Sequence, residues 1–275
     1  MNVIITGGSS GIGRAIVQRF CESGHNVLFT YYKNDGGASD LVRMYPERAH
    51  AVHCDQGDVN SVTNLYKAVK SWLGDRSIDG LINNAALGSG TVSFYDNFSP
   101  VIASDVKDKD PALQEFFEQA RKDEALMRVN ALGPLWVTRA LLPLMKGPDR
   151  SVIVMIGSVG GSTGAFPEYT PSDLMSKSAV AYLTKHLAAE HVHDHIDVIC
   201  LSPGATNTEM FQKSTLAKLS GSVEGFVSKF PKGRLIETEE IASACLWLTT
   251  QKSTARVANR MQAALSCTIS NCQCH

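Results

Sequence analysis

Short apolar runs rich in β-branched residues alternate with segments of helical period along most of the chain. We expect six of these runs to be strands: Asn2–Thr6, Asn26–Tyr31, His50–Cys54, Gly80–Asn83, Ser151–Ile156 and Asp197–Ser202. Runs of this length and composition are typical of strands buried on both faces of a sheet. Because strands that alternate with helices form βαβ units, the pattern predicts an α/β fold with a doubly wound parallel sheet.

The first of these units is complete within about 30 residues. Ile12, Ile16 and Phe20 recur at intervals of four residues, which predicts a helix over Gly13–Glu22. Gly24 is expected to end this helix, since glycine is the usual residue just beyond a helix C-terminus. The strand that follows should therefore run parallel to the first.

The pattern predicts a single domain over residues 1–255, followed by an atypical C-terminal tail over residues 256–275. Two segments depart from the simple alternation, Leu87–Pro111 and Thr208–Pro231. Both start at the carboxyl end of a predicted strand, where ligands bind in open parallel sheets. We therefore expect both segments to cover a substrate, the first with an apolar lining from Phe94, Tyr95 and Phe98.

The charge balance narrows the class of partner. The 275 residues include 26 Lys and Arg against 27 Asp and Glu, a net charge of −1 at pH 7. Such a chain has no field that would hold a polyanion, so we expect neither nucleic acid nor a membrane surface as a partner. No apolar run approaches the ~20 residues of a membrane span and no signal-peptide pattern opens the chain, so we expect a cytoplasmic location.

The cysteines and histidines indicate neither a disulfide framework nor a metal site. The histidines between positions 186 and 195 follow no compact ligand spacing and are ordinary near a helix C-terminus. We discount the cluster of cysteines in the tail in the same way and expect no metal. Four cysteines lie singly in apolar stretches, where a reduced thiol behaves as a small core residue: Cys21, Cys54, Cys200 and Cys245.

A glycine-rich turn directly follows the first predicted strand and opens the helix after it. It reads Thr6-Gly7-Gly8-Ser9-Ser10-Gly11-Ile12-Gly13. Glycines in such a turn allow backbone N–H groups and the helix N-terminus to approach a pyrophosphate. The position between strand and helix therefore predicts a dinucleotide site and a sheet of the Rossmann type.

Further motifs follow in order along the chain. They are Asn83-Asn84-Ala85-Ala86, Asn130 within Arg128–Gly133, Ser158 after the fifth predicted strand, Ser176-Lys177 in a helix, and Ser202-Pro203-Gly204 after the sixth strand. Together these motifs resemble the classical, single-domain branch of the short-chain dehydrogenase/reductase family, from residue 1 to about residue 250. The resemblance implies an NAD(P)(H)-dependent oxidoreductase that acts on a carbonyl or hydroxyl group of a small molecule.

The resemblance also implies roles for individual residues. It implies a pyrophosphate site at Gly7, Ser9, Ser10, Ile12 and Gly13, and an adenine contact at Asp55. It implies that Asn83 and Ala85 lie beside the nicotinamide ribose, and that Pro203, Gly204 and Thr208 hold the carboxamide. It implies that Lys177 binds the ribose hydroxyls, that Asn130 supports a proton relay and that Ser158 hydrogen-bonds the substrate oxygen.

The residues after the second predicted strand bear on the form of the cofactor. The stretch Phe29–Lys33 lacks the acidic residue that would bind a ribose 2′-hydroxyl. Lys33 could bind a 2′-phosphate instead. The sequence therefore favours NADP, with NAD as the alternative.

One position departs from the family pattern. The resemblance implies a tyrosine four residues before Lys177, where this chain has Asp173, and the nearest tyrosine is Tyr169. Thr170 as the N-cap, Pro171 after it and Asp173 in a capping-box pattern predict that the helix begins after Tyr169. The ammonium of Lys177 and the helix N-terminus both favour an ionised Asp173, which can accept a proton but cannot donate one.

Three functions stay open on the sequence. The first is hydride transfer between nicotinamide and a small molecule, with Ser158, Lys177, Asn130 and either Tyr169 or Asp173 in the proton path. The second is a redox-neutral cyclase, isomerase or lyase that uses Asp173 as base or counter-ion. The third is a non-catalytic nucleotide-binding homologue, against which the retained Ser158, Lys177 and dinucleotide site argue. We expect the first, because the cofactor motifs favour it by analogy.

The tail and two helices bear on assembly. Residues 256–275 lack the aspartate-glycine-glycine turn of the family's last strand, so the seventh strand and the tetramer contact are left open. The family's other dimer surface uses the helices of Asn130 and Lys177, and we expect a homodimer through it. Apolar residues recur on those helices at helical spacing: Leu132, Leu135, Val137, Leu141, Val180 and Leu183.

Overall fold

Six parallel strands form one sheet in the computed structural model, which describes residues 1–97, 110–145, 150–161, 166, 169–216, 222–228, 230 and 232–251. In that part of the chain the strands are β1 (Asn2–Ile5), β2 (Asn26–Tyr31), β3 (Ala49–His53), β4 (Gly80–Asn83), β5 (Ser151–Ile156) and β6 (Ile196–Leu201). Their order is β3-β2-β1-β4-β5-β6, and all neighbours are parallel. The predicted doubly wound α/β fold is confirmed.

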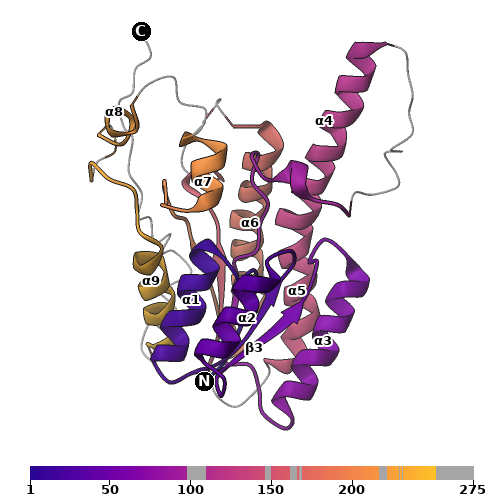
Figure 1. Cartoon of the computed structure of the whole chain (residues 1–275). Coiled ribbons are helices and arrows are strands. Elements are labelled where there is room, and N and C mark those ends of the chain that lie inside the picture. Colours follow the sequence, from indigo (N-terminus) through magenta and orange to yellow (C-terminus); the bar gives the residue numbers. More distant parts are fainter. Residues whose placement is uncertain are drawn as a thin grey trace.

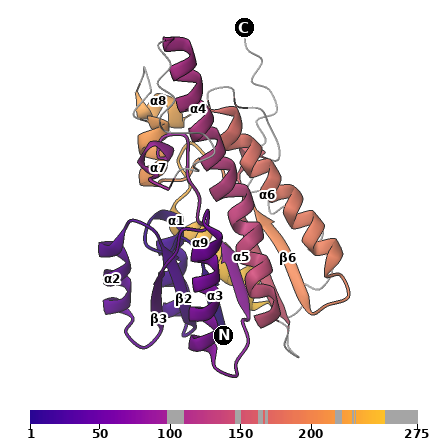
Figure 2. The same cartoon turned by 90° about the vertical axis from the view of Figure 1, so that its right-hand side faces the viewer.

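Alternate residues of the strands enter two separate hydrophobic cores. In β1, Val3 and Ile5 belong to one core and Ile4 belongs to the other, because side chains alternate across a sheet. On the first face lie α1 (Gly11–Glu22), α2 (Asp35–Met44) and α9 (Thr238–Thr250). On the second lie α3 (Val59–Leu73), α5 (Gly133–Leu141) and α6 (Pro171–Glu190). The sheet is therefore the middle of three layers (Figure 1 and Figure 2).

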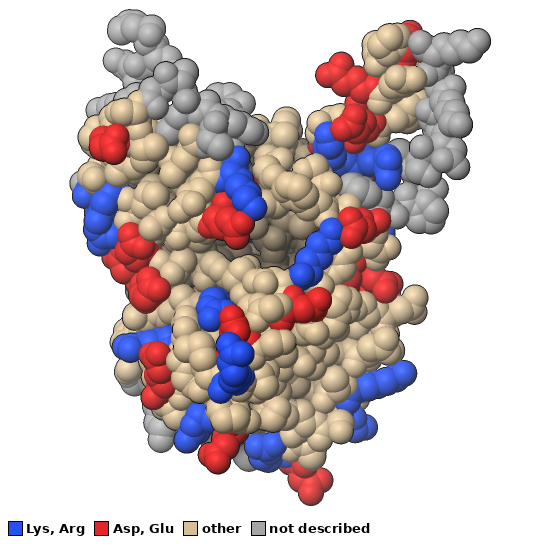
Figure 3. All heavy atoms as spheres, viewed as in Figure 1, with Lys and Arg blue, Asp and Glu red and all other residues tan. Residues whose placement is uncertain are grey.

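Shorter elements gather at the end of the molecule where the strands terminate. They are η1 (Val92–Phe94), η4 (Val159–Gly161), α7 (Glu209–Ser214) and α8 (Val223–Val227). The longer helix α4 (Pro111–Met127) projects beyond the sheet at the same end (Figure 1). Figure 3 shows that this face is hollowed between α7 and the base of α4, with charged side chains of both signs nearby. Open parallel sheets bind their ligands at this end.

Helices α4 and α5 are joined without a loop. A single π-helical turn, η2 (Arg128–Leu132), connects them, and η3 (Leu142–Leu144) follows α5. Asn130 therefore lies inside one continuous helical run. Gln56 Nε2 donates to the Val129 carbonyl oxygen of this turn at 2.8 Å. Turns of this kind are rare and recur at functional sites.

The boundaries of several elements differ slightly from the sequence prediction. The first and third strands end just before the predicted Thr6 and Cys54, the sixth ends before Ser202, and α1 begins at Gly11. The predicted bounds were therefore wrong by one or two residues at these ends. Thr6 and Cys54 lie just beyond their strands, although each still donates one hydrogen bond to the neighbouring strand, to Ile82 at 2.9 Å and to Tyr31 at 2.8 Å.

Three of the six apolar positions assigned to a dimer surface are buried inside this chain. Val137, Leu141 and Val180 are buried between α5, α6 and the sheet, and Leu183 packs against the same core. Leu132, by contrast, is 41% exposed. The assignment of the three buried residues was wrong, because helical spacing does not distinguish a side chain that faces its own sheet from one that faces a partner.

The remaining expectations about the tail fall outside the described residues, which end at position 251.

Cys21, Cys54, Cys200 and Cys245 are buried as free thiols, and burial raises the pKa of Cys245 to about 12. Within the described ranges no His, Cys, Asp and Glu side chains are grouped to hold a metal. No helix there has the length and apolar character needed to cross a membrane.

Candidate active site

The glycine-rich turn lies between β1 and α1, at the carboxyl ends of the strands. Gly7 has a φ of +67°, in the left-handed region that favours glycine. A Cβ at Gly13 would lie 2.0 Å from the Gly7 carbonyl oxygen and 2.5 Å from Asn84 Nδ2, so a side chain does not fit. A Cβ at Gly7 would lie 2.8 Å from Ala85 Cα. The turn is thus packed tightly against the end of β4.

The first turn of α1 presents N–H groups without a side-chain cap. Ser10 is the N-cap residue, and its side chain makes no cap hydrogen bond, whereas Asn34 and Asp58 cap α2 and α3. Open N–H groups at a helix N-terminus attract anions, since the helix dipole adds to their partial positive charge. The predicted pyrophosphate residues lie together around this turn: Gly7, Ser9, Ser10, Ile12 and Gly13.

The two asparagines at the end of β4 have different contacts. Asn83 Nδ2 donates to Thr138 Oγ1 at 3.0 Å, so this side chain points into the core beside α5. Asn84 Nδ2 donates to the carbonyl oxygens of Thr6 and Gly7 at 3.0 and 3.1 Å. Asn84 was not among the predicted site residues, although the doubled asparagine was a signal. Asn84 holds the shape of the glycine-rich turn.

Asn130 holds the segment that follows β4. The Leu87 N–H donates to Asn130 Oδ1 at 2.7 Å, and Asn130 Nδ2 donates to the Leu87 carbonyl oxygen at 2.8 Å. Nδ2 also donates to Ser176 Oγ at 3.1 Å, which links the turn to α6. Gln56 Nε2 donates to the Ala85 carbonyl oxygen at 2.8 Å. These contacts fix the chain between the end of β4 and α6.

Asp173 lies in the first turn of α6 and is 9% exposed. Its Oδ2 accepts hydrogen bonds from the Ser89 N–H at 2.9 Å and from Ser89 Oγ at 2.7 Å. Ser89 Oγ also lies 2.9 Å from Thr170 Oγ1. The predicted start of α6 after Tyr169 is confirmed, but the predicted capping box is wrong: Thr170 makes no cap hydrogen bond. Asp173 accepts from Ser89 instead, a partner that could not be predicted from the local sequence.

Lys177 follows Asp173 by one turn of α6. Burial lowers the pKa of its ammonium, and the negative charge of Asp173 partly offsets this. Gly161 of η4 packs on Lys177, since a Cβ at Gly161 would lie 2.5 Å from Lys177 Cβ. Ser158 precedes η4, and its Oγ accepts a hydrogen bond from the Gly160 N–H at 3.2 Å. The turn that carries Ser158 is thus held against the part of α6 that carries Lys177.

Tyr169 lies just outside α6, as predicted. Its hydroxyl oxygen is 3.1 Å from Thr215 Oγ1, at the residue that follows α7. Its N–H donates to the Phe166 carbonyl oxygen at 3.1 Å. The phenol of Tyr169 therefore faces the segment after β6, whereas the carboxylate of Asp173 faces the segment after β4.

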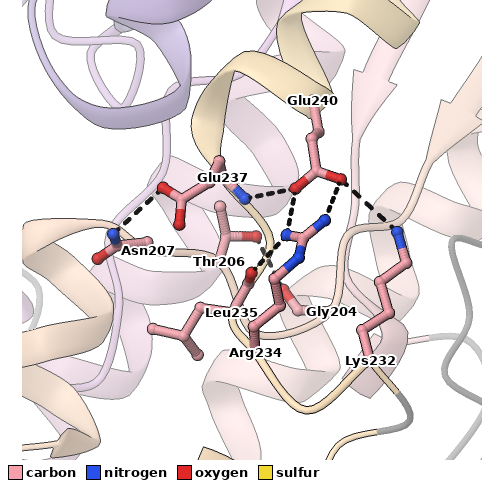
Figure 4. A network of polar contacts seen from close by, with 8 residues as sticks. All are labelled: Gly204, Thr206, Asn207, Lys232, Arg234, Leu235, Glu237 and Glu240. Atoms are coloured by element: carbon pink, nitrogen blue, oxygen red, sulfur yellow. Dashed lines mark hydrogen bonds and ion pairs between the residues drawn. The ribbon is translucent and has the colours of Figure 1, made fainter.

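The segment after β6 is anchored to the start of α9. The Asn207 N–H donates to the Ile236 carbonyl oxygen at 2.8 Å, and Glu240 accepts two hydrogen bonds from Arg234 at 2.6 and 2.9 Å. Glu240 also accepts from the Glu237 N–H at 2.9 Å (Figure 4). The hydrogen bonds from Arg234 lower the pKa of Glu240 to about 2. This network fixes the loop that contains the predicted carboxamide residues Pro203, Gly204 and Thr208.

Thr208 connects that loop with the glycine-rich turn. Its Oγ1 accepts a hydrogen bond from the Phe211 N–H at 3.2 Å and so caps α7. A Cβ at Gly11 would lie 3.6 Å from Thr208 Cγ2, which is ordinary contact distance. The predicted carboxamide segment and the predicted pyrophosphate turn therefore lie side by side.

The aromatic residues expected to line a substrate site are placed otherwise. Phe94 is 59% exposed, and Tyr95 is buried with its hydroxyl donating to Asp55 Oδ2 at 2.8 Å. Phe98 lies outside the described residues. Tyr95 therefore contacts the predicted adenine residue Asp55, because its hydroxyl donates to this buried carboxylate.

The chain matches the model of the short chain dehydrogenase family over residues 1–218. It is 30% identical over 254 residues to the 3alpha-hydroxysteroid dehydrogenase of Mediterraneibacter gnavus, covering 89% of this chain and 88% of that protein. It is 28% identical over 255 residues to the oxidoreductase YmfI of Bacillus subtilis, covering 91% of each. The crystal structure of BdcA with NADPH has a TM-score of 0.71 and 25% identity, over 94% of this chain and 90% of that one. The chain thus belongs to the short-chain dehydrogenase/reductase family and is an NAD(P)-dependent oxidoreductase that acts on small molecules.

Proposed function

We propose that the protein uses NADP(H) to interconvert a carbonyl and a hydroxyl group of a small molecule. The observation that carries the proposal is the tight glycine-rich turn beneath the uncapped N-terminus of α1. A pyrophosphate requires this close approach of backbone N–H groups. BdcA, which has the same fold, binds NADPH. The nicotinamide of such a cofactor supplies or takes up the hydride.

Three groups of residues are proposed to hold the cofactor. The pyrophosphate is assigned to the turn of Gly7, Ser9, Ser10, Ile12 and Gly13. The adenosine end is assigned to Asp55 and Lys33, and the preference for NADP rests on the ammonium of Lys33. The nicotinamide and its ribose are assigned to Lys177, to the backbone of Asn83 and Ala85, and to Pro203, Gly204 and Thr208.

In this proposal Ser158 binds the substrate oxygen and Tyr169 donates the proton during reduction. Asp173 already accepts two hydrogen bonds from Ser89, and a carboxylate has no proton to donate. A phenol carries its proton at neutral pH. Asn130 acts as a positioning residue, because its amide is held by Leu87 and Ser176.

Turnover of NADPH and NADH with a panel of carbonyl compounds, followed by nicotinamide absorbance, tests the proposal. Tyr169→Phe should lower kcat by about 10²–10⁴-fold, the range for a lost general acid. Asp173→Asn should lower it less than about tenfold. Ser178→Ala, on the exposed side of the same helix, is the control for folding. Turnover that survives Tyr169→Phe and is lost with Asp173→Asn would overturn the assignment of the proton donor.

A redox-neutral reaction is the second candidate, and the identity of residue 173 favours it. A carboxylate stands one helical turn from Lys177 where the family implies a tyrosine. In a cyclase, isomerase or lyase this group would act as base or counter-ion. Product that forms without a change in nicotinamide absorbance, and is lost with Asp173→Asn, would favour this candidate over the first.

We also propose that the protein is a cytoplasmic homodimer that pairs through the helices of Asn130 and Lys177. The exposed Leu132 lies on this run. Sedimentation equilibrium of the wild type and of Leu132→Glu tests the dimer, because a charge introduced at this exposed apolar side chain should yield monomers if the surface is paired. A wild-type monomer at micromolar concentration would contradict it.

A further inference from the structure

A four-residue segment, Phe94–Asn97, lies across the ends of β2 and β3. We call it the strap. It begins with the last residue of the short helix η1 and belongs to the excursion between β4 and α4. Its side chains and backbone contact both residues that are assigned to the adenosine end of the cofactor. The contacts are of two kinds, one at Asp55 and one at Lys33.

At Asp55 the strap supplies hydrogen-bond donors. The carboxylate is 7% exposed, and its Oδ2 accepts from the Tyr95 hydroxyl and from Asn97 Nδ2, each at 2.8 Å. Its other oxygen accepts from the Gly57 N–H at 2.8 Å. A Cβ at Gly57 would lie 2.8 Å from the Tyr95 hydroxyl, so glycine leaves room for the strap. The strap therefore meets Asp55 with N–H and O–H groups, as the amino group of an adenine would.

At Lys33 the strap supplies acceptors and a negative charge. The ammonium donates to the Phe94 carbonyl oxygen and forms an ion pair with Asp96 Oδ2 at 2.7 Å. This ammonium is the group that we assign to a ribose 2′-phosphate. The strap thus presents hydrogen-bond donors to Asp55 and a carboxylate to Lys33. The adenine amino group and the 2′-phosphate of NADP would present the same kinds of group to these two residues.

The strap is held from the opposite side by α4 and η2. The Arg128 guanidinium donates to the Asn97 carbonyl oxygen and lies over the Tyr95 ring, 5.8 Å from its centroid. Tyr95 packs with Leu126 and Val129 in a small separate core. Its ring also lies 5.7 Å from that of Tyr32, next to Lys33. These contacts make the strap an ordered occupant of the adenosine end.

We propose that the strap determines cofactor specificity by competing with the cofactor for Asp55 and Lys33. The inference rests on the proposed placement of the adenosine end at these two residues. Tyr95 and Asn97 oppose every adenine dinucleotide, because both NAD and NADP carry the adenine. Asp96 opposes only the phosphorylated form, because only NADP places an anion at Lys33. The strap therefore reduces the preference for NADP that Lys33 alone would give.

The test measures dissociation constants for NADPH and NADH, by cofactor fluorescence, in variants of the full chain. Asp96→Asn should bind NADPH about threefold more tightly and NADH unchanged, the size expected for one exposed ion pair. Asp40→Asn is the matched control, because it removes the same charge from an exposed pair with Arg43 on α2. Tyr95→Phe combined with Asn97→Ala should tighten both cofactors about equally.

Hydrogen exchange of the backbone over residues 94–97 gives a second measurement. If cofactor and strap compete, saturating NADPH should make these amides exchange faster, since the cofactor displaces the strap. Slower exchange would mean that the strap closes over the bound cofactor, which overturns the proposal. An equal gain of NADPH affinity in Asp96→Asn and Asp40→Asn would overturn it too, because the effect would then be one of overall charge.

Lys33→Ala separates this inference from the proposed function. NADPH affinity that falls in Lys33→Ala and stays constant in all strap variants would overturn the role of the strap and leave the cofactor site in place. NADPH affinity that does not change in Lys33→Ala would overturn both, because the 2′-phosphate would then lie elsewhere.

Discussion

Ser89 directs both its backbone N–H and its hydroxyl to the same carboxylate oxygen of Asp173, at 2.9 and 2.7 Å. The two residues are 84 positions apart, and their contact ties the segment after β4 to the first turn of α6. Hydrogen bonds to a charged acceptor are stronger than neutral ones, and this acceptor is buried. Residue 173 therefore has a structural task whatever its part in catalysis.

Asp173→Asn should lower the free energy of unfolding by about 1–3 kcal/mol. An amide oxygen is a weaker acceptor than a carboxylate oxygen, and an amide NH₂ group cannot accept from the Ser89 N–H or hydroxyl. Ser89→Ala should cost less, since the backbone N–H of residue 89 remains. The free energy of unfolding in urea measures both. Ser178→Ala, an exposed hydroxyl on α6 that donates to Leu174, should change it by less than about 0.5 kcal/mol. Additive effects of the two variants in the double variant would contradict a direct contact.

Lys177→Met should stabilise the protein at neutral pH and remove turnover. Burial lowers the pKa of Lys177 in the folded state. Keeping this ammonium charged in the folded protein therefore lowers the free energy of unfolding. Between this lowered pKa and the ordinary value of 10.5 the unfolded state binds more protons, so wild-type stability rises with pH. The advantage of the variant should therefore shrink as the pH approaches that value. A constant difference across the range, measured by urea unfolding, would exclude this cause.

Glu240→Gln should change the acid side of the stability profile. The pKa of Glu240 is lowered to about 2 in the folded protein, below an ordinary value of 4.5. Its contribution to stability is therefore complete above pH 4.5 and is lost as the pH falls towards 2. The melting temperature of the wild type should fall more steeply through this window than that of the variant. Glu239→Gln, an exposed acid in the same helical turn, is the matched control and should keep the wild-type slope.

Gly13→Ala should be among the most damaging single changes in the glycine-rich turn. Its methyl group would lie 2.0 Å from the Gly7 carbonyl oxygen, so the turn has to move away from β4. We expect a lower melting temperature and at least tenfold weaker NADPH binding, the loss of about 1.4 kcal/mol. Gly36→Ala tests the specificity of this effect, because nothing lies within 4 Å of the added group. Equal effects of both substitutions would show that steric fit at residue 13 is unimportant.

The features that could be predicted from the sequence are those encoded within a few neighbouring residues. The alternation of apolar runs and helical periods gave the order of strands and helices, and the glycine-rich turn follows directly from its place between β1 and α1. The start of α6 was predicted from Thr170 and Pro171. The family motifs were sufficient to indicate membership, which the comparison over residues 1–218 confirms.

The features that could not be predicted depend on contacts between distant parts of the chain. The capping box failed because Asp173 found Ser89, 84 positions away, in place of a local N–H. Tyr95 was expected at a substrate because of its aromatic ring, whereas its hydroxyl lies on Asp55, 40 positions away. Val137 and Val180 were assigned to a partner because periodicity gives a face of a helix and does not say what covers it.

The π turn at Arg128–Leu132 makes the length of this helical run as important as its composition. Such a turn holds one residue more than an α-helical turn, which advances 100° per residue. Deleting one residue of the turn would therefore restore plain α-helix and leave α4 and α5 in nearly the same helical phase. Only the residues of the turn itself, Arg128 and Asn130 among them, would change the direction in which they point. A deletion inside α4 or α5 has no wider turn to absorb it and would rotate the rest of that helix by about 100°.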